Sequence, residues 1–171
     1  MTGQAPTVEF LVTNGTSAGT TTFTIPGPPL PLPFDPGPFF SFGDLVLFSA
    51  TGYNGLNSLW ISNGTAAGTK PLSVTGTGTG ALGFGPTDFT LFGDKVLFSG
   101  RDAGGDWALW ITDATSTGTR ELTSGDINPE DITVIGGIAL FVSAPRARRY
   151  SVGDRRHGRR DKGARCFGRC R

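Results

Sequence analysis

The sequence predicts an all-β fold, built as a propeller-like array of four-stranded antiparallel blades. Three observations predict it. The 171 residues include 27 Gly and 12 Pro, which together with Thr interrupt almost every window of ten and exclude long helices. Two blocks of sequence recur in a fixed order with a period of about fifty residues. Each block consists of short apolar runs separated by turn-forming residues, which is typical of strands.

The first recurring block predicts a hairpin of two strands. Residues 42–49 read FGDLVLFS, residues 92–99 read FGDKVLFS, and a weaker copy at residues 135–141 reads IGGIALF. In each copy a Gly-Asp or Gly-Gly dipeptide separates two apolar runs, and such dipeptides favour tight hairpin turns. These runs are therefore the first and second strands of each unit.

The second recurring block predicts two further strands joined by a loop. Residues 59–69 read LWISNGTAAGT, residues 109–119 read LWITDATSTGT, and residues 11–20 read LVTNGTSAGT. The apolar start of each copy is the third strand, and the residues after the loop form the fourth. Four short strands in about fifty residues match one blade of a β-propeller.

The repeats divide residues 1–144 into two full blades and two half-blades. The full blades are residues 38–74 and 87–124. Residues 7–25 supply only a third and a fourth strand and residues 131–143 only a first and a second, so the two halves are complementary. They either pair with each other to close a ring or are completed by sequence outside this chain. Because three blades fall short of the four to eight of most propellers, we expect a piece of a longer array.

Large apolar side chains recur in the third strand. Leu59 and Trp60 are repeated as Leu109 and Trp110. We expect both indoles to fill the space between neighbouring blades, because a large residue that recurs at one strand position in each repeat usually packs in the core. A platform on which sugars stack is the alternative role for these rings.

Short polar residues and glycines recur in the loop after this strand. The side chains of Asn63 and Asp113 are placed to accept backbone N–H groups two residues further on, as in an Asx turn. We expect the glycines to supply positive φ and the threonines to cap the remaining loop backbone. These residues are Gly64, Thr65, Gly68, Thr69, Thr115, Gly118 and Thr119. The alternative is a calcium site formed by Asp113, Asp106 and loop carbonyls.

The composition argues against catalysis. Cys and His are absent from residues 1–144, and no nucleophile-elbow, phosphate-loop or paired-metal motif occurs there. We therefore predict that the protein is not an enzyme and has no catalytic, cofactor-binding or metal-binding residues. The carboxylates of Asp44 and Asp94 are the candidates for a glycosidase pair, but both stand in the repeated hairpin turns, where a structural role is expected.

The pattern Leu-Trp-x-x-Asn/Asp-Gly-Thr-x-x-Gly-Thr resembles the ELWxxDGT repeat family, found in large bacterial secreted or surface proteins, some of them hyalin-like. The resemblance covers most of residues 7–143 and implies an extracellular or cell-surface, propeller-like repeat without known catalytic residues. It does not identify a ligand. The sequence departs from the family pattern at Ser58 and Ala108, which replace Glu, and at Asn63, Ala114 and Leu11, which replace Asp, Gly and Trp.

The C-terminal segment differs in charge from the rest of the chain. Residues 1–144 carry four basic and twelve acidic side chains, a net charge of −8, whereas residues 145–171 carry eleven basic and two acidic ones, a net charge of +9. A one-nucleotide shift of the reading frame, with permissible codons, converts residues 151–161 into Leu-Trp-Val-Thr-Asp-Gly-Thr-Ala-Ala-Gly-Thr, the repeated block in its expected place. We therefore expect this tail to be out of frame or disordered. A true arginine-rich segment that binds anionic polymers is the alternative.

These observations predict a non-catalytic structural or adhesive module of a bacterial secreted or cell-surface protein. The expected partners are further repeats of a longer chain, or another surface protein or polysaccharide; nucleic acid is not expected. No stretch approaches the roughly 20 apolar residues of a membrane-spanning helix, and no signal peptide opens the sequence. The alternative function is that of a lectin-like module that binds carbohydrate or calcium.

Overall fold

A computed structural model describes residues 7–27 and 34–143 of the chain. The fold of this part is all-β, as predicted: its twelve strands form antiparallel sheets, and it contains no helix. Accordingly, none of the described segments is a helix that could cross a membrane. The predictions for residues 145–171, that the tail is disordered or out of frame, concern a segment outside the described residues.

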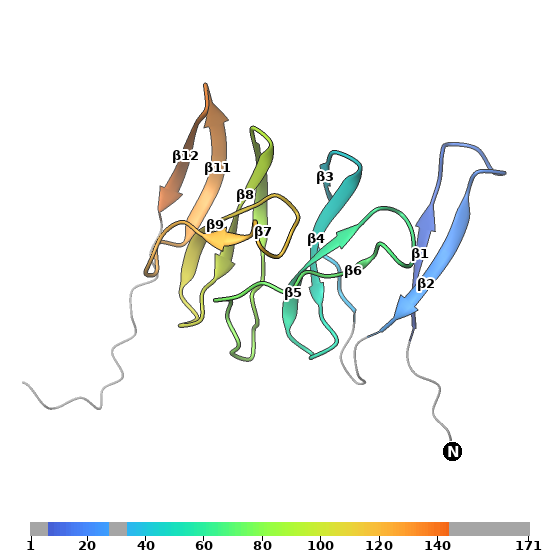
Figure 1. Cartoon of the computed structure of the whole chain (residues 1–171), viewed down its shortest axis with the longest axis horizontal. Helices are drawn as coiled ribbons and strands as arrows, with labels where there is room; N and C mark the ends of the chain where they lie inside the picture. Colours follow the sequence, from blue (N-terminus) through green and yellow to red (C-terminus); the bar gives the residue numbers. More distant parts are fainter. Residues whose placement is uncertain (1–6, 28–33, 144–171) are drawn as a thin grey trace, which may run out of the picture.

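Two four-stranded sheets form the middle of the molecule (Figure 1). The strands of each sheet follow one another in chain order, as expected for hairpins joined by short loops. The first sheet lies within residues 38–74 and the second within residues 87–124. The strands are β3 (Phe40–Phe42), β4 (Leu45–Thr51), β5 (Asn57–Ser62) and β6 (Lys70–Pro71) in the first sheet, and β7 (Thr87–Phe92), β8 (Lys95–Arg101), β9 (Trp107–Thr112) and β10 (Arg120–Glu121) in the second.

A two-stranded sheet lies at each end of the molecule (Figure 1). β1 (Thr7–Val12) pairs with β2 (Thr21–Pro26), and β11 (Pro129–Ile135) pairs with β12 (Ile138–Ser143). The first of these sheets ends one residue beyond the expected half-blade, and the second begins two residues before it. Each sheet thus has two strands, where the sheets in the middle have four.

The two four-stranded sheets share one strand register. In both, a Gly-Asp turn whose glycine lies in the left-handed region joins the first two strands. The register then sets Phe48 opposite Trp60 in the first sheet and Phe98 opposite Trp110 in the second. Each of these sheets therefore carries an aromatic pair on its two central strands.

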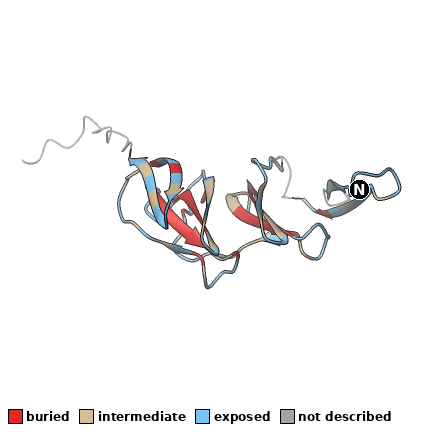
Figure 2. Ribbon diagram, turned by 90° about the horizontal axis from the view of Figure 1, so that it is seen from above, coloured by how far each residue is buried: buried red, intermediate tan, exposed pale blue. Residues whose placement is uncertain are grey.

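Apolar clusters fill the spaces between neighbouring sheets, and burial is greatest in the two four-stranded sheets (Figure 2). The central strands β4, β5, β8 and β9 each contribute to two of these spaces, because successive side chains point to opposite faces. Phe48 and Trp60 pack toward β1 and β2, whereas Leu47 and Leu59 pack toward the second four-stranded sheet. The core is therefore a series of layers between sheets.

The four sheets form an open row. The sheet of β1 and β2 and the sheet of β11 and β12 lie at opposite ends, and they do not pair with each other (Figure 1). The described part of the chain therefore contains no closed barrel or propeller. Of the two outcomes expected for the half-blades, closure of a ring within one chain is not the one that the molecule adopts.

Candidate functional site

Both recurring indoles are buried. The exposed fractions of Trp60 and Trp110 are 0% and 1%. Each ring nitrogen donates a hydrogen bond to a backbone carbonyl ten residues earlier: Trp60 to Ala50 at 3.2 Å and Trp110 to Gly100 at 3.1 Å. The prediction of core packing is confirmed. The alternative, a sugar-stacking platform on these rings, is wrong because their faces do not reach solvent.

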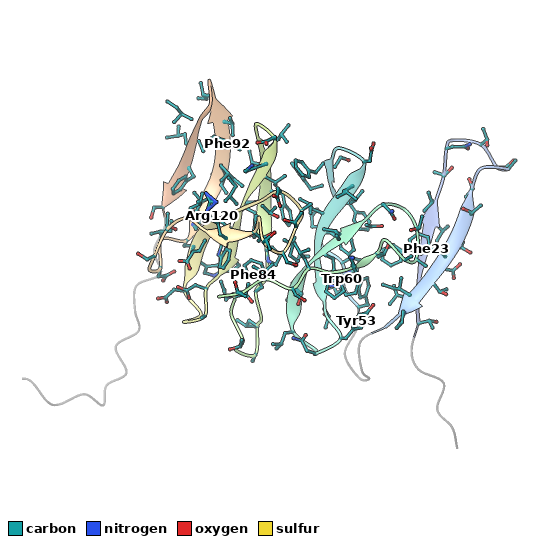
Figure 3. All side chains as sticks on the ribbon, in the orientation of Figure 1. Phe23, Tyr53, Trp60, Phe84, Phe92 and Arg120 are labelled. Carbon is teal, nitrogen blue, oxygen red and sulfur yellow. The ribbon has the colours of Figure 1, made fainter. Side chains whose placement is uncertain are left out.

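Aromatic rings cover both indoles. Phe34 and Tyr53 contact Trp60 edge-on, with ring centroids 5.2 Å and 5.5 Å from the indole. Phe84, from the segment that links the two four-stranded sheets, contacts Trp110 edge-on at 4.8 Å. Figure 3 shows Tyr53 beside Trp60, and Phe84 between the two sheets. Phe34 and Phe84 lie fifty residues apart, as Trp60 and Trp110 do, so this covering ring repeats with the indole, whereas Tyr53 has Ala103 at the matching position.

Gly100 makes room for this covering ring in the second sheet. A Cβ atom at this position would lie 2.5 Å from a carbon of the Phe84 ring, closer than van der Waals contact allows. The matching residue of the first sheet is Ala50, which is fully buried. The same strand position therefore holds a methyl group in the first sheet, at Ala50, and leaves space for the Phe84 ring in the second, at Gly100.

The loop after the indole strand is closed by hydrogen bonds between its own side chains and backbone. In the middle copy, Asn63 Oδ1 accepts hydrogen bonds from the Thr65 backbone N–H at 3.2 Å and from the Thr65 hydroxyl at 2.7 Å. Thr65 Oγ1 accepts the N–H of Gly68 at 3.1 Å, and the Thr69 hydroxyl donates to the Thr65 carbonyl at 2.7 Å. The predicted Asx turn and threonine caps are therefore present.

The other two copies of this loop repeat the pattern. Asp113 Oδ1 accepts hydrogen bonds from the Thr115 backbone N–H at 2.9 Å and from its hydroxyl at 2.6 Å. Asn14 Oδ1 accepts the corresponding bonds from Thr16 at 3.1 Å and 2.8 Å. The opening residue can thus be Asn or Asp, because the bonds need only an acceptor oxygen at this position.

The loop glycines have two different roles, which corrects the expectation that all of them supply positive φ. Gly64 has a φ of 81°, as expected, but Gly68 and Gly118 are not in the left-handed region. A Cβ atom at either of these two would overlap the side chain of the Asn or Asp that opens the loop. Ala114 stands where the middle copy has Gly64 and adopts a φ of 65°.

Hydrogen bonding holds the Asp113 carboxylate in its charged form. The bond from the Thr115 hydroxyl, and then that from the backbone N–H of the same residue, lower the pKa of Asp113 from its ordinary value, while its slight burial acts in the opposite direction. The Oδ1 atom of Asp113 therefore accepts its hydrogen bonds from within the loop.

The calcium site proposed from the sequence does not form. Asp106 and Asp113 flank the two ends of β9, and a strand that rises about 3.3 Å per residue separates them by roughly 20 Å. Within residues 7–27 and 34–143, no group of three or more His, Cys, Asp or Glu side chains is arranged to hold a metal ion. The alternative that pairs these two carboxylates on one cation is therefore wrong.

The structure brings together three acidic residues that the sequence reasoning did not single out. Asp88 in β7 and Asp131 in β11 have φ values of 56° and 54°, each at an irregularity of strand pairing. Burial raises the pKa of Asp88, and the carboxylates of Asp131 and Glu130 raise it further. The Thr90 hydroxyl donates to the Ile132 carbonyl at 2.9 Å and joins the two sheets there. The sequence signal was an Asp five residues before the turn glycines Gly93 and Gly136.

Two cavities lie next to the four-stranded sheets. One, of about 440 Å³, opens beside Tyr53 and is lined mainly by small polar residues, among them Asn54, Ser58 and Ser73. The other, of about 330 Å³, lies where the two four-stranded sheets meet and has Phe39 in its lining. The first therefore offers hydrogen-bonding groups beside a partly exposed ring, and the second is mainly apolar.

The two carboxylates considered for a glycosidase pair do not lie in one site. Asp44 and Asp94 lie in the turns of two different sheets, and Asp94 forms an exposed ion pair with Lys95 at 3.4 Å. No family model, no curated protein and no solved structure matches this chain. The function is therefore argued from the geometry of the repeats.

Proposed function

We propose that the chain is a non-catalytic structural and adhesive repeat module of a bacterial secreted or cell-surface protein, with its sheets stacked as in a propeller-like array. The observation that carries this proposal is that the repeated polar residues bond to one another. All three loops close through the same internal hydrogen bonds, and the repeated indoles bond to backbone carbonyls. A role in the fold accounts for each repeated residue without a ligand.

The packing of the sheets supports the array. Each four-stranded sheet buries one face against the preceding sheet and the other against the following one. Units that contact only their neighbours can be added in series, which is the principle of repeat proteins. The resemblance to ELWxxDGT repeats supports the bacterial, extracellular setting. Further repeats, another surface protein or a polysaccharide are the partners that such a module would contact.

The structural role can be tested by removing the central hydroxyl of two loops. The double variant Thr65→Val/Thr115→Val keeps side-chain volume but loses the hydrogen bonds to Asn63 and Asp113. Its melting temperature should fall, whereas Thr79→Val, at an exposed threonine outside the loops, should not change it. The wild-type Tm should be insensitive to millimolar calcium. A rise in Tm with calcium that the double variant lacks would contradict the proposal.

Carbohydrate binding is the second candidate, favoured by the cavity of about 440 Å³ beside Tyr53. The Tyr53 ring is partly exposed, and hydroxyl and amide groups surround the cavity. An aromatic face with polar neighbours is suited to stacking on a sugar ring. Saturable binding of the full chain to a glycan panel, lost in Tyr53→Ala and kept in Thr79→Val, would favour this function. A panel without binding would contradict it.

A further inference from the structure

The two ends of the row present the two halves of one strand pair. In the complete sheets the second strand pairs with the third: β4 with β5, and β8 with β9. By sequence match, β12 is a second strand and β1 is a third strand. Among residues 7–27 and 34–143, no strand pairs with the outer edge of either one. The outer edge of β12 therefore matches the outer edge of β1, as a second strand matches a third strand in the complete sheets.

Apolar side chains are exposed at these ends at positions that are buried in the complete sheets. Leu140 of β12 is 65% exposed, whereas the matching Leu47 and Leu97 are 0% and 2% exposed. Leu11 of β1 is 73% exposed, although it stands where the complete sheets have their buried indoles. β12 has no charged residue and β1 has only Glu9. An edge strand with few charges and exposed apolar residues is a site for pairing with another chain.

A cavity beside β1 has the lining that Leu140 requires. It measures about 150 Å³. Six of its wall residues are apolar, and among them are Phe10, Val12, Phe39 and Val46. The matching residues of the next sheet junction are Leu59, Ile61, Phe89 and Val96. These four share one apolar cluster with Leu47, and Leu47 matches Leu140. The cavity is therefore a sheet junction from which one leucine is missing.

We propose that β12 of one copy pairs with β1 of a second copy of this chain and completes a four-stranded sheet, with Leu140 in the cavity. The register of the complete sheets sets Phe141 opposite Leu11 and Leu140 opposite Val12 of the other copy. The contact continues the sheet-to-sheet packing that the chain already uses three times. It goes beyond the proposed function and does not depend on it.

The number of sheets predicts a closed pair. Each copy has two complete sheets and two half-sheets, which together amount to three blades. Two copies joined head to tail at both ends would give six blades, within the range of four to eight found in propellers, whereas three copies would exceed it. A head-to-tail interface forms a ring when its rotation closes. This count, unlike the strand pairing, rests on the propeller-like stacking proposed above.

Blocking each end separately tests the proposal. Leu140→Asp and Leu11→Asp place a charge on an exposed side chain of the free chain, so folding should be retained, but each would bury that charge at the interface. The full 171-residue chain should sediment as a dimer, and each variant alone as a monomer, with association weakened at least about a hundredfold. Leu82→Asp, at a loop leucine that is 64% exposed, is the matched control and should remain dimeric.

A mixture of the two blocked variants distinguishes head-to-tail pairing from other contacts. One variant keeps an intact β12 and the other an intact β1, so an equimolar mixture should form one-to-one dimers although neither variant dimerises alone. Dimerisation of either blocked variant alone would overturn the proposal. A wild-type chain that stays monomeric at high micromolar concentration, with β12 covered by its own residues 144–171, would also overturn it. Open polymers of the wild type would overturn the closed pair.

Discussion

The two four-stranded sheets have the same register, the same loop hydrogen bonds and a matching phenylalanine over the indole, but they differ in the residues around that ring. In the first sheet Trp60 lies under Phe34 and Tyr53, which come from segments on either side of β4. In the second, Trp110 lies under Phe84 alone, in the gap left by Gly100. The repeat therefore specifies the strands, the loop, the indole hydrogen bond and one covering phenylalanine, whereas the second ring, Tyr53, and the residue under the phenylalanine, Ala50 or Gly100, differ between the sheets.

Removing the indoles should have the largest effect. Trp60→Ala and Trp110→Ala should each lower the free energy of unfolding by about 3–5 kcal/mol in urea denaturation. The loss should be greater for Trp110, because it packs between two four-stranded sheets, whereas Trp60 faces a two-stranded one. Trp107→Ala is the control, since this ring is only partly buried and stacks on Arg101 at 4.1 Å. An equal loss for all three would contradict the comparison.

The next largest loss of stability is expected for a side chain added at Gly100, beside the Phe84 ring. Gly100→Ala should cost about 1–3 kcal/mol because the new methyl group meets the Phe84 ring. At the matching position of the first sheet, Ala50→Gly should cost about 1 kcal/mol through the lost methyl and added backbone freedom. Combining Gly100→Ala with Phe84→Ala should cost less than the sum of the two single changes in the same denaturation assay. Additive losses would show that the clash does not matter.

The left-handed loop position should give a smaller difference. Gly64→Ala should lower stability by about 1 kcal/mol, because its φ of 81° is unfavourable for a residue with a Cβ atom. Ala114→Gly relieves strain of similar size at a φ of 65° but removes a buried methyl group, so the net change should be within a few tenths of a kcal/mol. Thermal unfolding measures both, and a loss in Ala114→Gly as large as in Gly64→Ala would contradict this balance.

The smallest effects should be the pH dependences of Asp113 and Asp88, which have opposite signs. The lowered pKa of Asp113 stabilises the fold above the unfolded value of 3.8, and this contribution is lost as the pH falls through the folded pKa. The raised pKa of Asp88 destabilises the fold above its folded pKa, and this penalty disappears as the pH falls to the unfolded value. Asp113→Asn should therefore lower the Tm at neutral pH, and Asp88→Asn should raise it.

Melting curves recorded from neutral to strongly acidic pH measure both effects. Each Asn variant should approach the wild type in acid, where both carboxylates are protonated. Solvent screening keeps both effects small, since Asp88 is exposed and Asp113 is only partly buried. Shifts of the same sign at neutral pH in the two variants would contradict the assignment.

The features that could be predicted from the sequence are those set by local or repeated patterns. The Gly-Asp turn between β3 and β4 sets the register of that hairpin, with Phe42 opposite Leu45. The loop hydrogen bonds follow from residues only two to four positions apart. Recurrence of a large apolar residue at one strand position in both full repeats was sufficient to predict that the indoles are buried.

The features that could not be predicted depend on contacts between distant segments. Phe84 lies 26 residues before Trp110, and although Phe34 precedes Trp60 by the same number of residues, the contact between ring and indole depends on the folded path of the linking segment. The left-handed conformations of Asp88 and Asp131 arise where two sheets meet, and Asp ordinarily adopts other conformations. The role of Gly68 required the position of the Asn63 side chain, which only the folded loop supplies.

The segment that links the two four-stranded sheets has a mechanical consequence. The Phe84 N–H donates to the Asn57 carbonyl of the first sheet at 2.8 Å, and the Phe84 carbonyl accepts the Arg101 N–H of the second at 2.8 Å. The main chain of Phe84 is therefore hydrogen-bonded to both sheets. The apolar packing between the sheets is non-directional and offers less resistance to sliding. When the row of sheets is pulled from its two ends, we expect these two Phe84 hydrogen bonds to bear the force between the two four-stranded sheets.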